Sequence, residues 1–204
     1  MKNSQHLYGN KLFWINKRIF DITLGLLLLP LLFIIGIILL FFNLFLNQGR
    51  LLFIQKRMGK NCDFFFVIKF RTMTDNIEIT RKYDDPIETN RITSLGRILR
   101  KLRIDELPQI LNVIKGEMSF IGPRPDYFPH ALEYLNNIEG YRERHNVRPG
   151  ITGLSQIRLG YVESLEATSK KVHIDNYYIQ NVGYIIELKI IFNTILIIIR
   201  GMGK

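Results

Sequence analysis

The uncharged stretch from Ile22 to Leu46, ITLGLLLLPLLFIIGIILLFFNLFL, decides the fold class of this 204-residue chain. As an α-helix it would be about 37 Å long, which exceeds the hydrocarbon core of a bilayer at about 30 Å. A helix of this length on the surface of a soluble domain carries a polar face, and this stretch has none. The stretch is too long for a signal peptide, and no small-residue cleavage site follows it. The sequence therefore predicts a helix that enters a membrane.

Basic residues flank this stretch on both sides. They are Lys11, Lys17 and Arg18 before it, and Arg50, Lys56, Arg57 and Lys60 after it. The positive-inside rule places flanks rich in Lys and Arg on the cytoplasmic side. Pro30 removes the backbone hydrogen bond to Leu26 and kinks a helix. Two topologies fit: a re-entrant helix that turns at Pro30 and leaves both flanks in the cytoplasm, and a kinked helix that crosses the membrane once.

The charge of the chain also points to a membrane surface. The formal net charge is +10, from 28 Lys+Arg against 18 Asp+Glu, and most of the excess lies in residues 1–60, where Asp21 is the only acidic residue. Basic residues beside an apolar run are typical of proteins at anionic membranes. The rest of the chain is close to neutral and has no nucleic-acid-binding motif, so nucleic acid is not an expected partner. A lone cysteine, Cys62, excludes an intrachain disulfide.

The remainder of the chain mixes strand and helix patterns, which indicates an α+β class. Leu51–Gly59 and Phe64–Met73 are β-rich stretches joined by a turn. Asp75–Asn90 is polar, carries charges of both signs and predicts a loop. Tyr184–Arg200 is apolar nearly all round but contains charged residues, which predicts an interfacial helix or a helix docked on the first segment.

Two adjacent carboxylates stand out in the segment from Thr93 to Lys115. Apolar residues at helical spacing predict a first helix, and its basic flank consists of Arg97, Arg100, Lys101 and Arg103. Because proline is tolerated in the first turn, a second helix is expected from near Asp105 to Gly116. Asp105 and Glu106 would then lie at its N-terminus among cations. By itself such a pair indicates a helix cap; beside a basic cluster and anion-binding loops it is also what a phosphate site with a divalent metal needs.

Two stiff loops follow, each built around one arginine. They are Gly122–Pro125 (GPRP), with Arg124, and Val147–Gly153 (VRPGITG), with Arg148. Glycines there would let main-chain N–H groups approach a ligand, and a stiff loop with one arginine suits bidentate capture of a phosphate. An ordinary turn with a solvated arginine is the alternative for either loop. The histidines lack ligand spacing, and no G-x-S-x-G, G-x-G-x-x-G or Walker motif occurs.

Taken together, these motifs resemble those of the bacterial sugar transferases, the small monotopic phosphoglycosyl transferases that begin lipid-linked glycan assembly. The resemblance runs along nearly the whole chain and rests on Lys17–Asp21 (KRIFD), Lys69–Met73 (KFRTM), Asp105–Gln109 (DELPQ), Lys115–Ser119 (KGEMS), Gly122–Pro125 and Arg148–Gly153. It implies an N-terminal re-entrant helix broken at Pro30, in residues 1–49. A cytoplasmic catalytic domain of helices and short strands, with interfacial helices, would occupy residues 50–204. The location would be the bacterial inner membrane.

The resemblance also implies a reaction. Asp105 would attack the β-phosphorus of a UDP-sugar, release UMP and hold the phosphosugar until polyprenol (undecaprenyl) phosphate takes it. Mg²⁺ would be the cofactor, with Asp105 as its contact, and Glu106 would assist. Expected partners are the UDP-sugar, the polyprenol phosphate, membrane lipid and downstream glycosyltransferases. Residues expected to contact substrate or its phosphates are Lys17, Arg18, Lys69, Arg97, Arg124, Arg148 and Asp175. The alternative function is a membrane-anchored basic protein that binds polyanions or serves as a scaffold in glycan assembly.

Overall fold

A computed structural model describes residues 9–46, 49–74, 89–160 and 164–200. Its elements in chain order are α1 (Lys11–Leu46), β1 (Leu52–Met58), β2 (Phe64–Phe70), α2 (Ser94–Lys101), α3 (Gln109–Lys115), β3 (Ser119–Ile121), α4 (Phe128–Asn137), β4 (Gly150–Thr152), α5 (Leu154–Leu159), α6 (Leu165–Gln180) and α7 (Tyr184–Ile199). Most of the loop predicted at Asp75–Asn90 lies outside the described residues. The mixture of helices and short strands confirms the α+β class.

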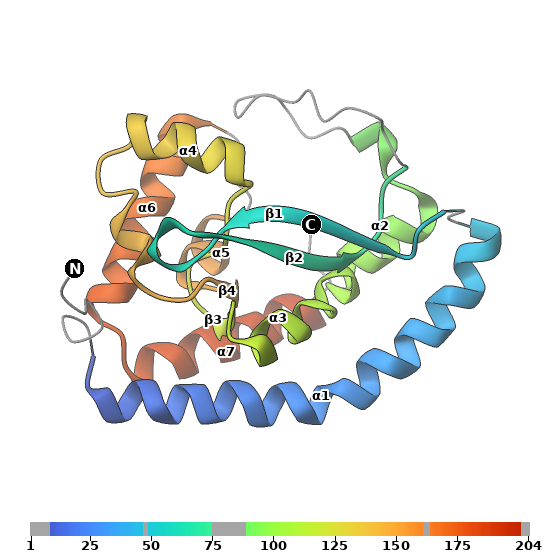
Figure 1. Cartoon of the computed structure of the whole chain (residues 1–204), viewed down its shortest axis with the longest axis horizontal. Coiled ribbons are helices and arrows are strands. Elements are labelled where there is room, and N and C mark those ends of the chain that lie inside the picture. Colours follow the sequence, from blue (N-terminus) through green and yellow to red (C-terminus); the bar gives the residue numbers. More distant parts are fainter. Residues whose placement is uncertain (1–8, 47–48, 75–88, 161–163, 201–204) are drawn as a thin grey trace.

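The apolar stretch forms the greater part of α1, a single helix of 36 residues with Pro30 inside it. Figure 1 shows α1 along the lower side of the molecule, bent near its middle. The helix continues through Pro30, so the structure has a bend in place of the expected break. Among the described residues, α1 is the one helix long and apolar enough to cross a membrane, and few of its residues are buried.

Both halves of α1 pack against the same folded body. In the N-terminal half, Asp21 is buried, and its Oδ1 atom accepts a hydrogen bond of 3.0 Å from the hydroxyl of Ser119. In the C-terminal half, Leu39 packs with Phe70 and Leu99 in one buried cluster. Both halves of α1 are therefore tied to one domain, while many large apolar side chains between Asp21 and Leu39, such as Leu27 and Phe33, are exposed.

The predicted β-rich stretches form an antiparallel hairpin, β1–β2, which pairs Leu52 with Phe70 and Met58 with Phe64. Its turn contains Asn61 and Cys62, whose φ angles of 59° and 62° are both positive. Two successive positive φ angles are typical of the type I′ turn, which matches the twist of a hairpin. A second, parallel pair joins β3 to β4.

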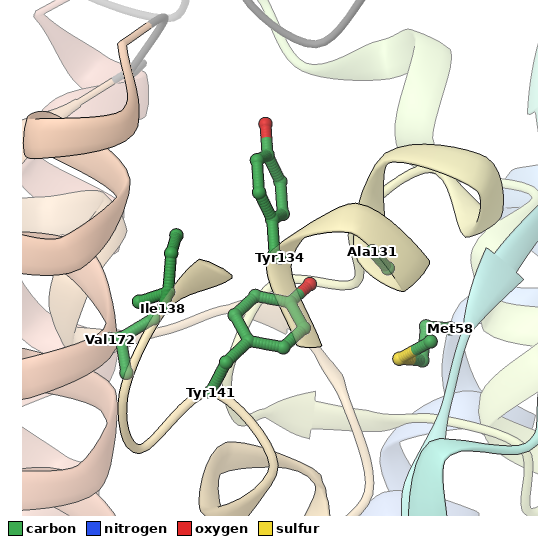
Figure 2. Close-up of a cluster of buried hydrophobic side chains, with 6 residues drawn as sticks. All are labelled: Met58, Ala131, Tyr134, Ile138, Tyr141 and Val172. Atoms are coloured by element: carbon green, nitrogen blue, oxygen red, sulfur yellow. The ribbon is translucent and has the colours of Figure 1, made fainter. Parts of the chain in front are cut away.

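A hydrophobic core lies between α4, α6 and the end of β1. It consists of Met58, Ala131, Tyr134, Ile138, Tyr141 and Val172, and Figure 2 shows the Tyr141 ring in the middle of the group. The hydroxyl of Tyr141 donates a hydrogen bond of 2.8 Å to Oδ2 of Asp126. This apolar core is thus joined directly to a buried charge network that reaches the candidate site.

The predicted C-terminal helix is α7, and it docks on the first segment through the Lys17–Glu187 ion pair, while its predicted place at the membrane interface stays a prediction. Glu187 and Ile190 are buried against the body, whereas Ile185, Leu188 and Phe192 are exposed. The N-terminal part of α7 contacts α1 through the Lys17–Glu187 ion pair and the edge-on packing of Phe13 and Tyr184, and Figure 1 shows α7 above this part of α1.

Candidate active site

The adjacent carboxylates lie in a short 3₁₀ turn, Ile104–Glu106, between α2 and α3. The α-helix expected from Asp105 to Gly116 begins only at Gln109, with Pro108 as its N-cap. The prediction of the helix start was therefore wrong by one turn, because Arg103 adopts a left-handed conformation with a φ of 59° and the chain turns there. Asp105 and Glu106 are 9% and 4% exposed, so both carboxylates lie in a largely dry environment.

Glu106 is surrounded by cations. Both Nη atoms of Arg124 donate to its carboxylate, Nη1 to Oε2 at 3.2 Å and Nη2 to Oε1. Nζ of Lys69 donates to Oε1 at 3.0 Å, and Nη1 of Arg103 lies 3.7 Å from Oε2. Burial opposes ionisation, but Arg124 and Lys69 outweigh it and hold the pKa of Glu106 well below its usual value. Glu106 is therefore a fixed carboxylate that orients the basic side chains.

Asp105 differs from its neighbour. Its carboxylate makes no hydrogen bond or ion pair with any side chain in the described part of the chain, although cations lie near it. Burial raises the pKa of Asp105, the negative charge of Glu106 raises it further, and Lys69, Arg124 and Arg100 oppose both effects. A buried carboxylate whose oxygens are not engaged, beside a group of cations, is suited to contact a polyanionic ligand, as a nucleophile or as a metal ligand.

The helix α2 brings Arg100 to the site. Nε of Arg100 donates a hydrogen bond of 2.9 Å to Oγ1 of Thr72, and a Cβ atom at Gly96 would lie only 2.1 Å from the Thr72 carbonyl oxygen. This close approach fixes α2 on the end of β2. Arg97, the predicted residue of this helix, has an exposed side chain, and its contact with phosphate stays a prediction. Arg100 could have been found from the sequence, because it belongs to the same basic flank as Arg97 and follows it by one helical turn.

The two stiff loops bind each other. The N–H of Gly122 donates to the carbonyl of Thr152, and the N–H of Gly150 donates to that of Pro123, both at 2.9 Å. A Cβ atom at Gly150 would lie 2.1 Å from the nitrogen of Gly122. The expectation that these glycines let N–H groups approach a ligand was wrong for Gly122 and Gly150, because the glycines let the two chains approach one another.

The arginines of these loops point to different places. Arg124 binds Glu106, whereas Nε of Arg148 donates to the carbonyl of Gly116 at 2.7 Å, at the C-terminal end of α3. Arg18 lies at that same end, where its Nη atoms donate to the carbonyls of Val113 and Ile114 at 2.6 and 2.8 Å. Cations at a helix C-terminus complement its dipole and its unpaired carbonyls. The structure therefore separates Arg18 and Arg148 from the carboxylates by the length of α3.

Lys17 is engaged elsewhere. It forms a buried ion pair of 2.6 Å with Glu187 of α7, and the hydroxyl of Tyr178 donates to the same oxygen at 2.7 Å. These contacts join α1 to α6 and α7. The predicted contacts of Lys17, Arg18 and Arg148 with substrate phosphates stay predictions, and the structure does not bring these three residues to Asp105.

Asp175 belongs to a buried charge network behind the site. Nε of Arg144 donates to Asp175 at 3.0 Å, and the same guanidinium binds Asp126, which also accepts from Lys171. Nη2 of Arg144 then donates to the backbone carbonyl of Arg124 at 2.8 Å. Asp175 is thus connected to the site only through Arg144 and the backbone carbonyl of Arg124, and its predicted contact with substrate stays a prediction. Sequence reasoning missed Arg144 and Asp126, which no local pattern distinguishes from surface residues.

The residues present fit one mode of magnesium binding. Among the described residues, no three His, Cys, Asp or Glu side chains gather in a group that could hold a metal. Mg²⁺ is commonly bound by one or two carboxylates together with substrate phosphates and water. Asp105 has oxygens available for that mode, whereas Arg124 occupies both oxygens of Glu106.

Comparison with known proteins agrees with this geometry. Residues 12–201 match the model of a family described as bacterial sugar transferase. A UDP-N-acetylgalactosamine-undecaprenyl-phosphate N-acetylgalactosaminephosphotransferase of Aeromonas hydrophila is 41% identical over 77% of this chain and 37% of its own length. A UDP-glucose:undecaprenyl-phosphate glucose-1-phosphate transferase of Escherichia coli K12 is 36% identical over 93% of this chain and 42% of its own. The chain thus spans less than half the length of these two relatives. The exopolysaccharide production protein PSS of Rhizobium leguminosarum is 37% identical over 92% of this chain and 97% of its own length.

Proposed function

The chain belongs to the bacterial sugar transferase family, and on this premise we propose that it is a membrane-bound phosphoglycosyl transferase. The reaction moves a sugar 1-phosphate from a UDP-sugar to undecaprenyl phosphate and releases UMP. The names of two relatives, which specify undecaprenyl phosphate as acceptor, support this reaction class. The structural observation that carries the proposal is the contrast between the two carboxylates: Glu106 is held by Arg124 and Lys69, whereas Asp105 is left to engage a ligand.

The proposed first step is a displacement at phosphorus. A carboxylate oxygen of Asp105 attacks the β-phosphorus of the UDP-sugar, and the bond from this phosphorus to the bridging oxygen breaks. The bridging oxygen leaves with the electron pair as part of UMP, and the phosphosugar stays on Asp105 as an acyl phosphate. Lys69, Arg124 and Arg100 balance the charge of the diphosphate, which would otherwise repel the carboxylate.

The second step returns Asp105 to its starting form. A phosphate oxygen of the lipid acceptor attacks the same phosphorus, the bond to Asp105 breaks, and polyprenyl-diphosphate-sugar leaves. The two steps share one phosphate pocket, which is the advantage of a covalent intermediate. Mg²⁺, held by Asp105 and the donor phosphates, would neutralise negative charge during transfer. Glu106 serves as the anchor that keeps Lys69 and Arg124 in place.

The proposed location is the cytoplasmic face of the bacterial inner membrane, with α1 as a re-entrant helix. The contacts of Asp21 and Leu39 support this topology, because both ends of α1 pack on one domain. A helix with its ends on opposite sides of a hydrocarbon core of about 30 Å would have to give up one set of contacts. Cysteines introduced at Asn10 and Arg50, in a Cys62→Ser background, should react with a membrane-impermeant reagent only from the cytoplasmic side. Labelling from opposite sides would contradict the re-entrant helix.

The activity test uses the purified chain, Mg²⁺, undecaprenyl phosphate and a panel of UDP-sugars, with UMP release as the readout. Wild type should turn over at least one sugar, and Asp105→Asn should lose at least about a thousandfold in rate. With the donor alone, intact-mass analysis should find the mass of one phosphosugar added to wild type and none added to Asp105→Asn. The exposed Asp63→Asn variant is the matched control. Equal rates for Asp105→Asn and Asp63→Asn would refute the nucleophile.

A further inference from the structure

A second basic site lies in a hollow between the N-terminal half of α1 and the domain body. From α1 it is lined by Trp14, Arg18 and Asp21, and from the body by Lys60, Asn146 and Arg148. None of the residues around Asp105 lines this hollow. It lies at the C-terminal end of α3, whose seven residues span about 10 Å, while Asp105 precedes the N-terminal end.

Positive charge in this hollow exceeds negative charge. Its lining contains four cations and one carboxylate: Lys17, Arg18, Lys60 and Arg148 against Asp21. Lys17 is paired with Glu187, so three cations remain to face Asp21. Oδ1 of Asp21 already accepts hydrogen bonds of 3.0 Å from the hydroxyl of Ser119 and from a backbone N–H. Burial lowers the pKa of Arg148, and the neighbouring Arg18 lowers it further, because the guanidinium groups repel each other. Helix capping accounts for Arg18 and for Nε of Arg148, but it leaves the third cation unexplained.

Lys60 is that third cation, and the fold holds it there. It begins the hairpin turn of β1–β2, and the buried His145 fixes this turn through its Nδ1 atom, 2.9 Å from the carbonyl oxygen of Gly59. Because a carbonyl can only accept, Nδ1 of His145 carries the proton, and burial lowers the pKa of His145 to about 3, so the ring is neutral. The half-buried Lys60 ammonium makes no hydrogen bond or ion pair within the described ranges. Burial lowers the pKa of Lys60, and Arg148 lowers it further.

An arrangement of this kind is unfavourable without a ligand. Half-burying an ammonium group beside two guanidinium groups costs energy that an oxyanion in the hollow would offset. A phosphate is chemically suited to this lining, because its oxygens accept hydrogen bonds from ammonium and guanidinium groups.

The position of the hollow indicates where such a phosphate comes from. On the outer face of α1, beside the hollow, Ile15, Ile19 and Ile22 are exposed apolar side chains. Their place on a helix that enters the membrane sets this part of α1 at the level of lipid headgroups. We propose that the hollow binds the phosphate of an anionic phospholipid headgroup and so fixes the depth of the domain at the membrane. The hollow lies at the opposite end of α3 from Asp105, and the proposal rests on the proposed membrane location and not on the reaction step at Asp105.

Trp14 makes the proposal testable, because it is the one tryptophan of the chain and it lines the hollow. The full chain in zwitterionic micelles would be titrated with dioctanoyl phosphatidylglycerol, with dioctanoyl phosphatidylcholine and with inorganic phosphate, while Trp14 emission is followed. We expect a saturable change with phosphatidylglycerol at a far lower concentration than with the other two. Lys60→Gln should raise the midpoint about tenfold, and Lys60→Arg should restore it.

The control is Lys115→Gln, which removes one exposed positive charge from α3 outside the hollow. It should titrate like wild type. An equal loss in Lys60→Gln and Lys115→Gln, or no saturable change in wild type, would overturn the site. Saturation by inorganic phosphate at the same concentration as phosphatidylglycerol would retain the phosphate site and overturn the lipid as its ligand. Without lipid, Lys60→Gln should unfold at a temperature no lower than wild type, since no described partner loses a contact and the repulsion from Arg148 is removed.

Discussion

The guanidinium of Arg124 binds both oxygens of the Glu106 carboxylate, at the residue directly after Asp105. Arg124 is itself held from behind, because Arg144 donates to its backbone carbonyl. The chain of contacts from Arg144 through Arg124 to Glu106 ends beside a carboxylate that the described residues leave unengaged. The Glu106 carboxylate is therefore fixed by its partners, whereas the Asp105 carboxylate can contact a ligand. This arrangement suits the proposed two-step phosphoryl transfer.

The two parallel hydrogen bonds from the Arg124 guanidinium to Glu106 should matter more to the reaction rate than the positive charge of Arg124. In Arg124→Lys the charge remains but the two parallel hydrogen bonds to Glu106 cannot form. We expect kcat/KM for UMP release to fall about a hundredfold. The exposed Arg142→Lys variant is the control and should retain the wild-type kcat/KM. A wild-type kcat/KM in Arg124→Lys would show that Arg124 contributes charge alone.

Loss of the Asp105 charge should stabilise the protein while it abolishes turnover. Burial and Glu106 raise the pKa of Asp105, so its ionised form is disfavoured in the folded state. This penalty is fully present above the folded-state pKa and disappears as the pH falls below it. Asp105→Asn should therefore raise Tm by about 3 °C at pH 7 without Mg²⁺ or donor, and the gain should vanish in acid. A lower Tm at pH 7, measured by thermal unfolding in detergent, would contradict the assigned environment.

The rate should have an acid limb set by Asp105. The nucleophile must be ionised, so kcat/KM for UMP release, which reports the free enzyme, should decline as the pH falls through a value above the ordinary aspartate pKa of 3.8. Arg100→Gln removes a cation that opposes the shift and should move the limb to higher pH. Glu106 stays ionised over this range because its pKa is held well below the usual value. A limb at or below 3.8 in the wild type, or one unmoved by Arg100→Gln, would contradict this prediction.

The buried network should be worth far more than an exposed ion pair. Arg144→Met leaves Asp126 and Asp175 without their shared guanidinium, which should cost about 3–5 kcal/mol of unfolding free energy. The exposed pair Lys170–Glu166 offers the comparison, and Lys170→Met should change the unfolding free energy far less, because solvent screens this pair. Urea unfolding in one detergent measures both variants. Similar losses for the two would show that the network contributes no more than surface charge.

Several features of this protein were readable without coordinates because they depend on neighbours in the chain. The helix α1 follows from a long uncharged run, and the β1–β2 hairpin follows from two β-rich stretches around a short turn. The Asp105–Glu106 pair was identified from its adjacency and its basic surroundings. Helical period, apolar length and turn chemistry are local properties, so the sequence alone determined them.

The tertiary structure decided what each charged residue does. Arg124 and Arg148 occupy similar Pro/Gly loops, yet the backbone pairing of those loops sends one arginine to Glu106 and the other to the end of α3. Lys17 meets Glu187 across 170 positions of sequence. An ion pair depends on which elements pack together, and burial sets its strength. No local pattern encodes that packing, and so the division between a cation of the candidate site, a helix cap and a structural ion pair exists only in the folded chain.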